Sequence, residues 1–329
     1  MQRREFITLL GGAAAAWPLA ARAQQSGKVA RIGFLGAASA NAAGYANRIA
    51  AFRSGLRDLG YVEGTNLVIE YRWAEEKYER LPELAADLIR ANVDVVVTHG
   101  TPASVAAKRA TATIPVVMAM IGDPIASGIV TSVARPGGNI TGSSFFSPEI
   151  SPKRIELLKE TMPQLTRAAA LLNRDNPMNM GAELQAMETV AQSLKLQLKQ
   201  FPVRASNEFE RTFDTMQGEH VEGVTLGEDP IFIANLTAIG ALASKRRLLS
   251  IGSKEFAQAG GLIGYGIDFT AAYRRAAVFV EKILKGSKPG DLPIEQATKF
   301  DFVLNLKTAK ALGFEVPTPI LLRADEVVE

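Results

Sequence analysis

The stretch Val-Asp-Val-Val-Val-Thr-His-Gly-Thr-Pro-Ala-Ser at residues 93–104 decides the fold class of this chain. Residues 93–98 form an almost continuous β-branched run, which is typical of a parallel strand buried on both faces. Thr101 and Pro102 then supply an N-cap and a first helical residue, so a helix begins directly after the strand. A buried strand that turns at once into a helix is the unit of an α/β fold with parallel sheets.

The same alternation extends in both directions along the chain. Upstream, apolar residues spaced 3, 4 and 3 apart from Ile49 to Leu59 predict a helix that ends at Gly60, between strands at 31–35 and 67–73. Downstream, Arg-Pro-Gly-Gly-Asn at 135–139 breaks the pattern, which then restarts. The remaining predicted strands are 115–120, 140–146, 167–173, 196–202, 222–227, 248–252, 262–267 and 300–305. The remaining predicted helices are 81–89, 181–194, 207–216, 231–245, 270–285 and 307–312, and a further helix is predicted to begin at the cap Ser151-Pro152.

The chain therefore consists of two similar α/β runs with a restart near residue 145. No linker between them is long or of low complexity. With 329 residues, the chain exceeds what one core usually holds, so we expect two Rossmann-like lobes packed around a cleft. Ligands of such sheets bind beyond the carboxyl ends of the strands, so functional residues are expected just after strands.

Composition and motifs exclude several function classes. The chain has no cysteine, which excludes disulfides, thiolate metal sites and cysteine nucleophiles. Without residues 1–23, the formal charge falls from +3 to +1, and no basic stripe suggests nucleic acid or an anionic membrane surface. There is no P-loop, G-x-S-x-G or H-E-x-x-H motif, so we expect no catalytic residues, no metal and no cofactor.

The N-terminus is predicted to be an export signal. Arg3-Arg4 precedes a moderately apolar run that is too short to span a bilayer, and Ala21-Arg22-Ala23 supplies the small-x-small pattern for cleavage. We expect residues 1–27 to act as this signal, with cleavage after Ala23 and a periplasmic product that does not insert in the membrane. The paired arginines resemble a twin-arginine signal, and an ordinary secretory signal is the alternative.

Polar residues follow several predicted strands and form the candidate binding site. Free N–H groups and a hydroxyl at a helix start suit a carboxylate, and acids opposite would hold an ammonium group, so the pattern fits a zwitterion such as an amino acid. Each residue has a structural alternative, because capping or turn formation would also explain it. The strand-end candidates are Ser39, Gly100, Thr101, Ser104, Asp123, Asn173, Asp229 and Asp268.

Aromatic residues and one histidine extend the candidates. Tyr45, Trp73, Phe145 and Tyr265 are placed to stack on an apolar part of the ligand, with core packing as the alternative. His99 ends the buried strand and faces either the cleft or the core. An exported hydrolase or isomerase that uses His99 with an aspartate is therefore a rival function, although no partner motif supports it.

Several long motifs of the chain resemble those of a known protein family. The chain resembles the ABC-transporter substrate-binding proteins similar to the tryptophan/tyrosine-type binding protein, a branch of the type I periplasmic binding fold. The resemblance runs from about residue 29 to the C-terminus. It rests on GDPIASGIVTSVARPGGNITG at 122–142, LGYVEGTNLVIEYRWAE at 59–75, AGGLIGYGIDFTAAYRRAAVFVEKILKG at 259–286, and residues 291–329.

The resemblance implies three crossovers between the lobes. Lobe 1 would comprise residues 28–143 plus 270–296, and lobe 2 residues 144–269 plus 297–329. It implies ligand contacts at Ser39, Thr98–Thr101, Asp123, Asn173, Asp229 and Asp268, which adds Thr98 to the strand-end set.

The implied function is a periplasmic solute-binding component of an ABC importer, not an enzyme. It would bind a small polar ligand, an aromatic amino acid among the candidates, by lobe closure and deliver it to permease subunits as a monomer. A ligand-sensing subunit for a membrane receptor is the alternative. The chain departs from some members in lacking a lipid-anchoring cysteine, and residues 248–253 are less typical than their surroundings.

Overall fold

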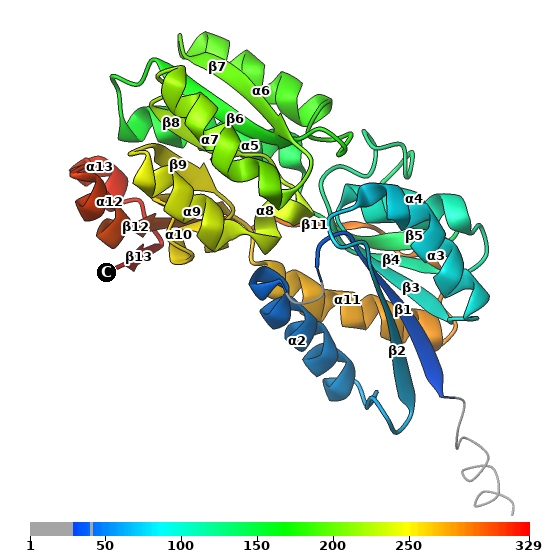
Figure 1. Ribbon diagram of the computed structural model, residues 1–329. Coiled ribbons are helices and arrows are strands. Elements are labelled where there is room, and N and C mark those ends of the chain that lie inside the picture. The colour runs from blue at the N-terminus through cyan, green and yellow to red at the C-terminus, as the bar shows by residue number, and fades with distance from the viewer. Residues whose placement is uncertain (1–28, 40–41) are drawn as a thin grey trace, which may run out of the picture.

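The computed structural model describes residues 29–39 and 42–329, so the predicted export signal at 1–27 lies outside the described residues. Two sheets flanked by helices form two halves that lie side by side (Figure 1). This confirms the predicted α/β class with two mostly parallel sheets. Within the described ranges, no helix combines the length and the apolar character needed to cross a membrane.

The first half is built on a six-stranded sheet in which every pair of neighbours runs parallel. Its strands, in spatial order, are β11 (Glu295–Gln296), β5 (Ile140–Ser144), β4 (Val116–Ile121), β3 (Val95–His99), β1 (Ala30–Gly36) and β2 (Leu67–Trp73). Its helices are α2 (Ala43–Asp58), α3 (Leu81–Arg90), α4 (Thr101–Ala110) and α11 (Phe269–Leu284).

The helices cover both faces of this sheet, which explains why its strands are apolar throughout. Val96 of β3 packs with the α3 and α4 side, whereas its neighbours Val95 and Val97 pack with the α2 and α11 side. Successive side chains of a strand point to opposite faces, so both faces need apolar residues. The β-branched run of the sequence thus becomes the middle of a covered sheet.

The second half is built on a seven-stranded sheet in which β12 runs antiparallel to β10. Its strands, in spatial order, are β13 (Glu326–Val328), β12 (Asp301–Asn305), β10 (Ile263–Gly266), β9 (Leu249–Gly252), β8 (Gly223–Leu226), β6 (Arg167–Asn173) and β7 (Gln197–Val203). Its helices are α5 (Ser147–Thr161), α6 (Ala182–Ser193), α7 (Phe209–Gly218), α8 (Pro230–Ala234), α9 (Leu236–Lys245), α10 (Lys254–Gln258), α12 (Leu306–Leu312) and α13 (Thr318–Leu321).

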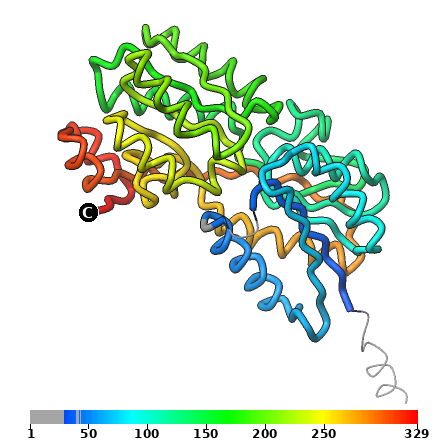
Figure 2. The backbone as a smooth tube through the Cα atoms, in the orientation of Figure 1, coloured from blue at the N-terminus to red at the C-terminus, as the bar shows by residue number. Residues whose placement is uncertain are grey.

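Within the described ranges, the chain passes between the two sheets three times. The passages lie between β5 and α5, between β10 and α11, and between β11 and β12. The second passage returns α11 to the first half, where it packs along α2 and against β4. Figure 2 shows this late, orange segment running beside the early, blue one.

Two predicted helix boundaries were wrong. Helix α5 starts at Ser147, four residues before the predicted cap at Ser151-Pro152, and Pro152 lies inside it. The Ser-Pro pair at 147–148 supplies an equally good start, with Pro148 in the first turn. The predicted helix 231–245 is two helices, α8 and α9, which meet at Asn235.

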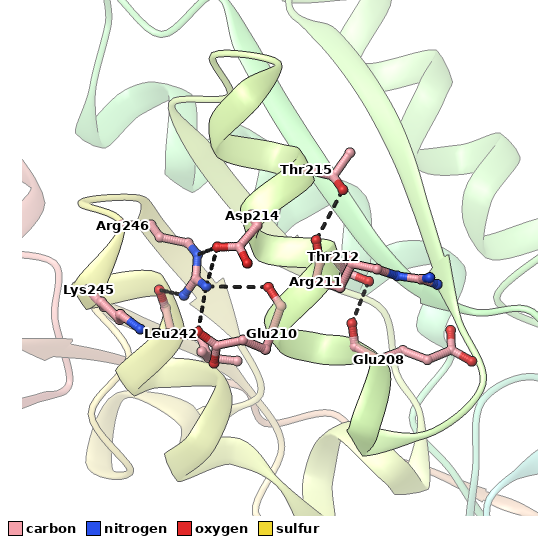
Figure 3. Close-up of polar contacts among 9 residues, drawn as sticks. All are labelled: Glu208, Glu210, Arg211, Thr212, Asp214, Thr215, Leu242, Lys245 and Arg246. Carbon is pink, nitrogen blue, oxygen red and sulfur yellow. Dashed lines mark hydrogen bonds and ion pairs between the residues drawn. The ribbon is translucent and has the colours of Figure 1, made fainter.

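A charged cluster fastens α9 to α7 on the second half (Figure 3). Arg246 follows the last residue of α9, and its guanidinium lies 2.6 Å from a carboxylate oxygen of Asp214 and 2.8 Å from one of Glu210. The Arg246 side chain is almost fully buried, whereas both acids are exposed. The pairing is local to this helix pair, so we assign it a structural role.

Candidate functional site

A small cavity of about 10 Å³ lies between the two halves, where strand ends of both sheets meet. His99, Gly100 and Thr101 follow β3 on one side, and Asp229 follows β8 on the other. The carboxyl ends of parallel strands are the usual binding edge of such sheets. Other wall residues are Gly122, Phe145, Ser147, Glu228, Pro230 and Phe269.

The start of α4 approaches the second half closely at Gly100. Its φ is +79°, and a Cβ added there would lie 2.6 Å from Cγ of Pro230. Gly100 is the N-cap, and Thr101 is the first helical residue, one position from the N-cap role predicted for it. No side chain of the described residues caps α4, so Thr101 lines the cavity instead.

Asp229 is one of the two acids that line the cavity, next to Glu228, and it is deeply buried. Its Oδ1 accepts hydrogen bonds from the Tyr78 hydroxyl at 2.8 Å, Asn173 Nδ2 at 3.0 Å and the Ile231 amide at 2.9 Å. Its Oδ2 accepts from Asn176 Nδ2 at 2.9 Å. Burial raises the pKa of this carboxyl above its ordinary value, and the four donors oppose that rise.

Beneath Asp229, buried polar residues hold the turn after β6 in place. Asn179 accepts from the Asn173 amide and donates to the Glu183 carboxylate and to the Glu228 carbonyl. Glu183 also accepts from the Glu228 amide and from Ser151, and burial raises its pKa to about 7. Arg154 pairs with the Glu228 carboxylate. The network connects the interior of the second half to the cavity wall.

Two further contacts join the halves beside the cavity. Glu76 accepts from the Ser206 amide at 3.0 Å, the Ser206 hydroxyl at 2.7 Å and Asn235 Nδ2 at 2.9 Å. On α2, Arg48 Nη2 lies 3.4 Å from Oε1 of Glu255 on α10. Together with the Tyr78–Asp229 bond, these contacts hold the two halves closed over the cavity.

A buried aromatic group adjoins the cavity at His99 and Phe269. The His99 ring lies 5.3 Å from the Tyr45 ring and 5.4 Å from the Tyr273 ring, measured between centroids. The Arg48 guanidinium lies 4.2 Å from the Phe269 centroid. Burial, and next the charge of Arg48, lower the pKa of His99 well below its ordinary value. His99 is therefore a neutral imidazole within this group.

Comparison with known proteins places this architecture in a family. The family model described as ABC transporter substrate binding protein matches residues 41–328. The chain belongs to this family. Its members bind small-molecule ligands, work with permease components and are typically exported; they are solute-binding proteins rather than enzymes.

Relatives of this substrate binding protein share both sequence and fold. A tyrosine-binding protein of Clostridioides difficile (strain R20291) is 24% identical over 80% of this chain and 76% of its own length. The ABC domain from Streptococcus pneumonia in complex with L-Trp is 25% identical, with a TM-score of 0.82 over 92% of this chain and all of that one. A conserved domain protein from Vibrio cholerae O1 biovar El Tor is also 25% identical, with a TM-score of 0.83 over 91% of this chain and all of that one. The fold is that of the type I periplasmic binding proteins.

In this substrate binding protein, the sequence-predicted site residues are only partly brought together. Gly100, Thr101 and Asp229 line the cavity, and Asn173 supports Asp229 from behind. Thr98 is buried behind the wall, where its hydroxyl pairs with that of Ser104 at 2.8 Å.

Three other predicted residues lie apart from the cavity lining. Asp123 accepts from the amides of Ile125 and Ala126 in its own turn. Asp268 is exposed, caps α11 through the Ala271 amide, and lines a separate groove of about 420 Å³. Ser39 is half-buried and stands next to residues 40–41, which lie outside the described ranges.

The sequence reasoning missed the residues that make the buried contacts of this binding protein. Tyr78, Asn176, Asn179 and Glu183 act through partners that are distant in the chain. The sequence did contain a pattern that indicates Arg48. Arg48, Phe52 and Leu56 are spaced four residues apart and lie on the same buried face of α2. A charge on such a face indicates a buried ionic role.

Proposed function

We propose that this protein is the periplasmic solute-binding component of an ABC import system. Its two halves act as lobes, with residues 28–143 plus 270–296 in one and 144–269 plus 297–329 in the other. A small polar solute binds between them and is enclosed by lobe closure. The closed protein then delivers the solute to permease subunits.

One observation carries the proposal: a buried hydrogen bond spans the two halves at the cavity. Tyr78 comes from the first half, and Asp229 comes from the cavity wall of the second. The hydrogen bond can form only when the two halves are together. Because its acceptor Asp229 also lines the cavity, a ligand in the cavity would affect whether the halves close. Ligand drives closure only when it binds the closed form more tightly than the open form.

The relatives support an aromatic amino acid or a close analogue as the ligand. One relative is named a tyrosine-binding protein, and another was solved in complex with L-Trp. Phe145 and Phe269 line the cavity and supply aromatic surface for such a ligand. The export signal at 1–27 and cleavage after Ala23 are part of the proposal, as is a monomeric protein free of the membrane.

A thermal-shift screen tests the proposed function. The purified protein is screened against amino acids, small carboxylates, sugars and nucleosides, and hits are titrated by calorimetry. A ligand at one hundred times its Kd stabilises the folded state by about 2.7 kcal/mol, which is readily measured. Binding of one solute with a 1:1 stoichiometry supports the proposal. Chemical conversion of a screened compound by the protein, instead of stable binding, would support the rival enzyme function.

A further inference from the structure

Four polar groups belong to one buried cluster of aromatic residues and Arg48 beside the cavity. The Tyr45 hydroxyl, Arg48 Nη1, His99 Nδ1 and the Tyr273 hydroxyl have no hydrogen-bond partner among the described residues. All four residues are at most 2% exposed. An unpaired buried polar atom costs about 1–3 kcal/mol, so four in one place indicate a group that binds there.

All four groups are suited to an acceptor, and one carries a positive charge. Tyrosine hydroxyls and arginine donate, and a neutral imidazole donates through one of its ring nitrogens. Arg48 pairs with Glu255 through a single contact of 3.4 Å. Glu255 Oε2 also has no hydrogen-bond partner among the described residues. Both the guanidinium and the carboxylate of this pair therefore keep hydrogen-bonding capacity. A buried arginine that is weakly paired is poised to take an anion.

The two acids that line the cavity are already engaged by donors of the protein itself. Asp229 already receives four donors, three at Oδ1 and one at Oδ2, and the Glu228 carboxylate is paired with the buried Arg154. The other two strand-end acids lie outside the cavity lining, Asp123 in its own turn and Asp268 at the start of α11. Among the described residues of this cluster, donors without a partner outnumber acceptors without one, which favours a negative group over a free ammonium group.

We infer that Tyr45, Arg48, His99 and Tyr273 bind the carboxylate of the ligand, and that the ligand class is aromatic carboxylic acids, for which an α-amino group is dispensable. The inference rests on the proposed function and revises the zwitterion model. Of the four residues, His99 lines the cavity, and its ring contacts that of Phe269, which in turn contacts Phe145. A carboxylate bound by the four residues would therefore direct the ring of the ligand toward Phe145 and Phe269. Offset and edge-on ring contacts of this kind favour flat aromatic ligands.

Three matched compounds test the inference by calorimetry. L-Tyrosine carries both charged groups, 3-(4-hydroxyphenyl)propionate lacks the amino group, and tyramine lacks the carboxylate. We expect the propionate to bind within about threefold of tyrosine, and tyramine to bind at least about a hundredfold more weakly, because charge-assisted hydrogen bonds are the strongest available here. Tyramine binding as tightly as tyrosine would overturn the inference, and so would tyrosine binding without the propionate.

Variants locate the carboxylate. Arg48→Gln is expected to weaken propionate binding at least thirtyfold and to leave the weak binding of tyramine unchanged. Arg57→Gln is the control, because Arg57 is exposed on the same helix. Tyr273→Phe removes a hydroxyl that has no partner among the described residues, so its melting temperature should be maintained while propionate affinity falls. This second variant keeps the test decisive if Arg48→Gln does not fold.

Failure of the inference is distinguishable from failure of the proposed function. Unchanged propionate affinity in both variants would overturn the carboxylate site. Binding of a sugar or nucleoside, with none of the three aromatic compounds bound, would overturn the inference and retain the solute-binding proposal. No binding across the whole screen would overturn both.

Discussion

The Tyr78 hydroxyl and the Asp229 carboxylate, 151 residues apart in the chain, meet at 2.8 Å inside the contact between the lobes. Tyr78 lies in a short 3-10 helix (Tyr78–Arg80) before α3, and Asp229 is the N-cap of α8. The bond thus connects a helix entry on one lobe with a helix start on the other. Burial and the neighbouring Asp229 carboxylate raise the pKa of Tyr78 well above its ordinary value, so its hydroxyl remains a donor.

Tyr78→Phe is predicted to weaken ligand binding about fivefold to tenfold. The variant loses one buried hydrogen bond, worth about 1 kcal/mol, from the closed form alone. Calorimetry gives the affinity, and small-angle scattering gives the fraction of closed protein. Tyr71→Phe is the control, since the Tyr71 hydroxyl has no partner among the described residues. Equal affinities for the two variants would contradict a role of this bond in closure.

Gly100→Ala is predicted to prevent full closure. The added Cβ would lie 2.6 Å from Cγ of Pro230 on the other lobe, so the lobes must separate to relieve the clash. Gly128→Ala is a matched control, because Gly128 has a φ of +68° and nothing within 4 Å of an added Cβ. Both variants should lose similar stability, about 1 kcal/mol, from the positive φ. Only Gly100→Ala should lose at least tenfold in ligand affinity. An equal loss of affinity in the two variants would rule out a steric block of closure.

Glu76→Ala is predicted to speed ligand release about tenfold. Glu76 accepts three hydrogen bonds from Ser206 and Asn235 on the other lobe, and alanine keeps the same backbone while removing all three. Net losses of about 1–2 kcal/mol correspond to this change in rate. Stopped-flow fluorescence measures the release. Glu79→Ala, three residues further and exposed, should leave the rate unaltered.

Folding stability is predicted to fall as the pH rises from about 4.5 to about 7. Burial raises the pKa of Glu183 from its usual value near 4.5 to about 7, so in this window the folded state binds more protons than the unfolded state. Stability therefore decreases with rising pH. Glu183→Gln should flatten the slope measured by urea unfolding. Glu188→Gln on the same helix should retain it, and a wild-type slope of the opposite sign would exclude this assignment.

The sequence allowed prediction of the sheets because their strands carry local signals. β2 and β6 were predicted with the bounds that the structure has, and β3 was identified from its β-branched run. Helix starts were less predictable, because the two Ser-Pro pairs at 147–148 and 151–152 carry the same local signal. Only packing selects the earlier pair: Ser151 is buried and donates to Glu183 from within α5.

The candidate site was predictable as a location in the fold and less so as a set of contacts. Strand ends placed Gly100, Thr101 and Asp229 near one another, and the structure has them in the cavity lining, because the edge of a parallel sheet follows from topology. Whether an acid is free or already satisfied depends on partners far away in the chain. Tyr78 and Asn176 saturate Asp229 across distances that no local pattern encodes. Arg48 gains its importance in the same way, from aromatic residues of α11.

The return of α11 to the first lobe dictates the order in which the chain can complete its folding on the ribosome. The face of the first sheet that carries Phe34 and Val97 stays uncovered on the α11 side until residues up to 284 have been made. That is roughly 140 residues after β5, a delay of about 7–30 s at ordinary synthesis rates. Nascent protein thus carries an apolar face that only α2 covers for that period. An export route that carries folded cargo would have to wait for nearly the entire polypeptide.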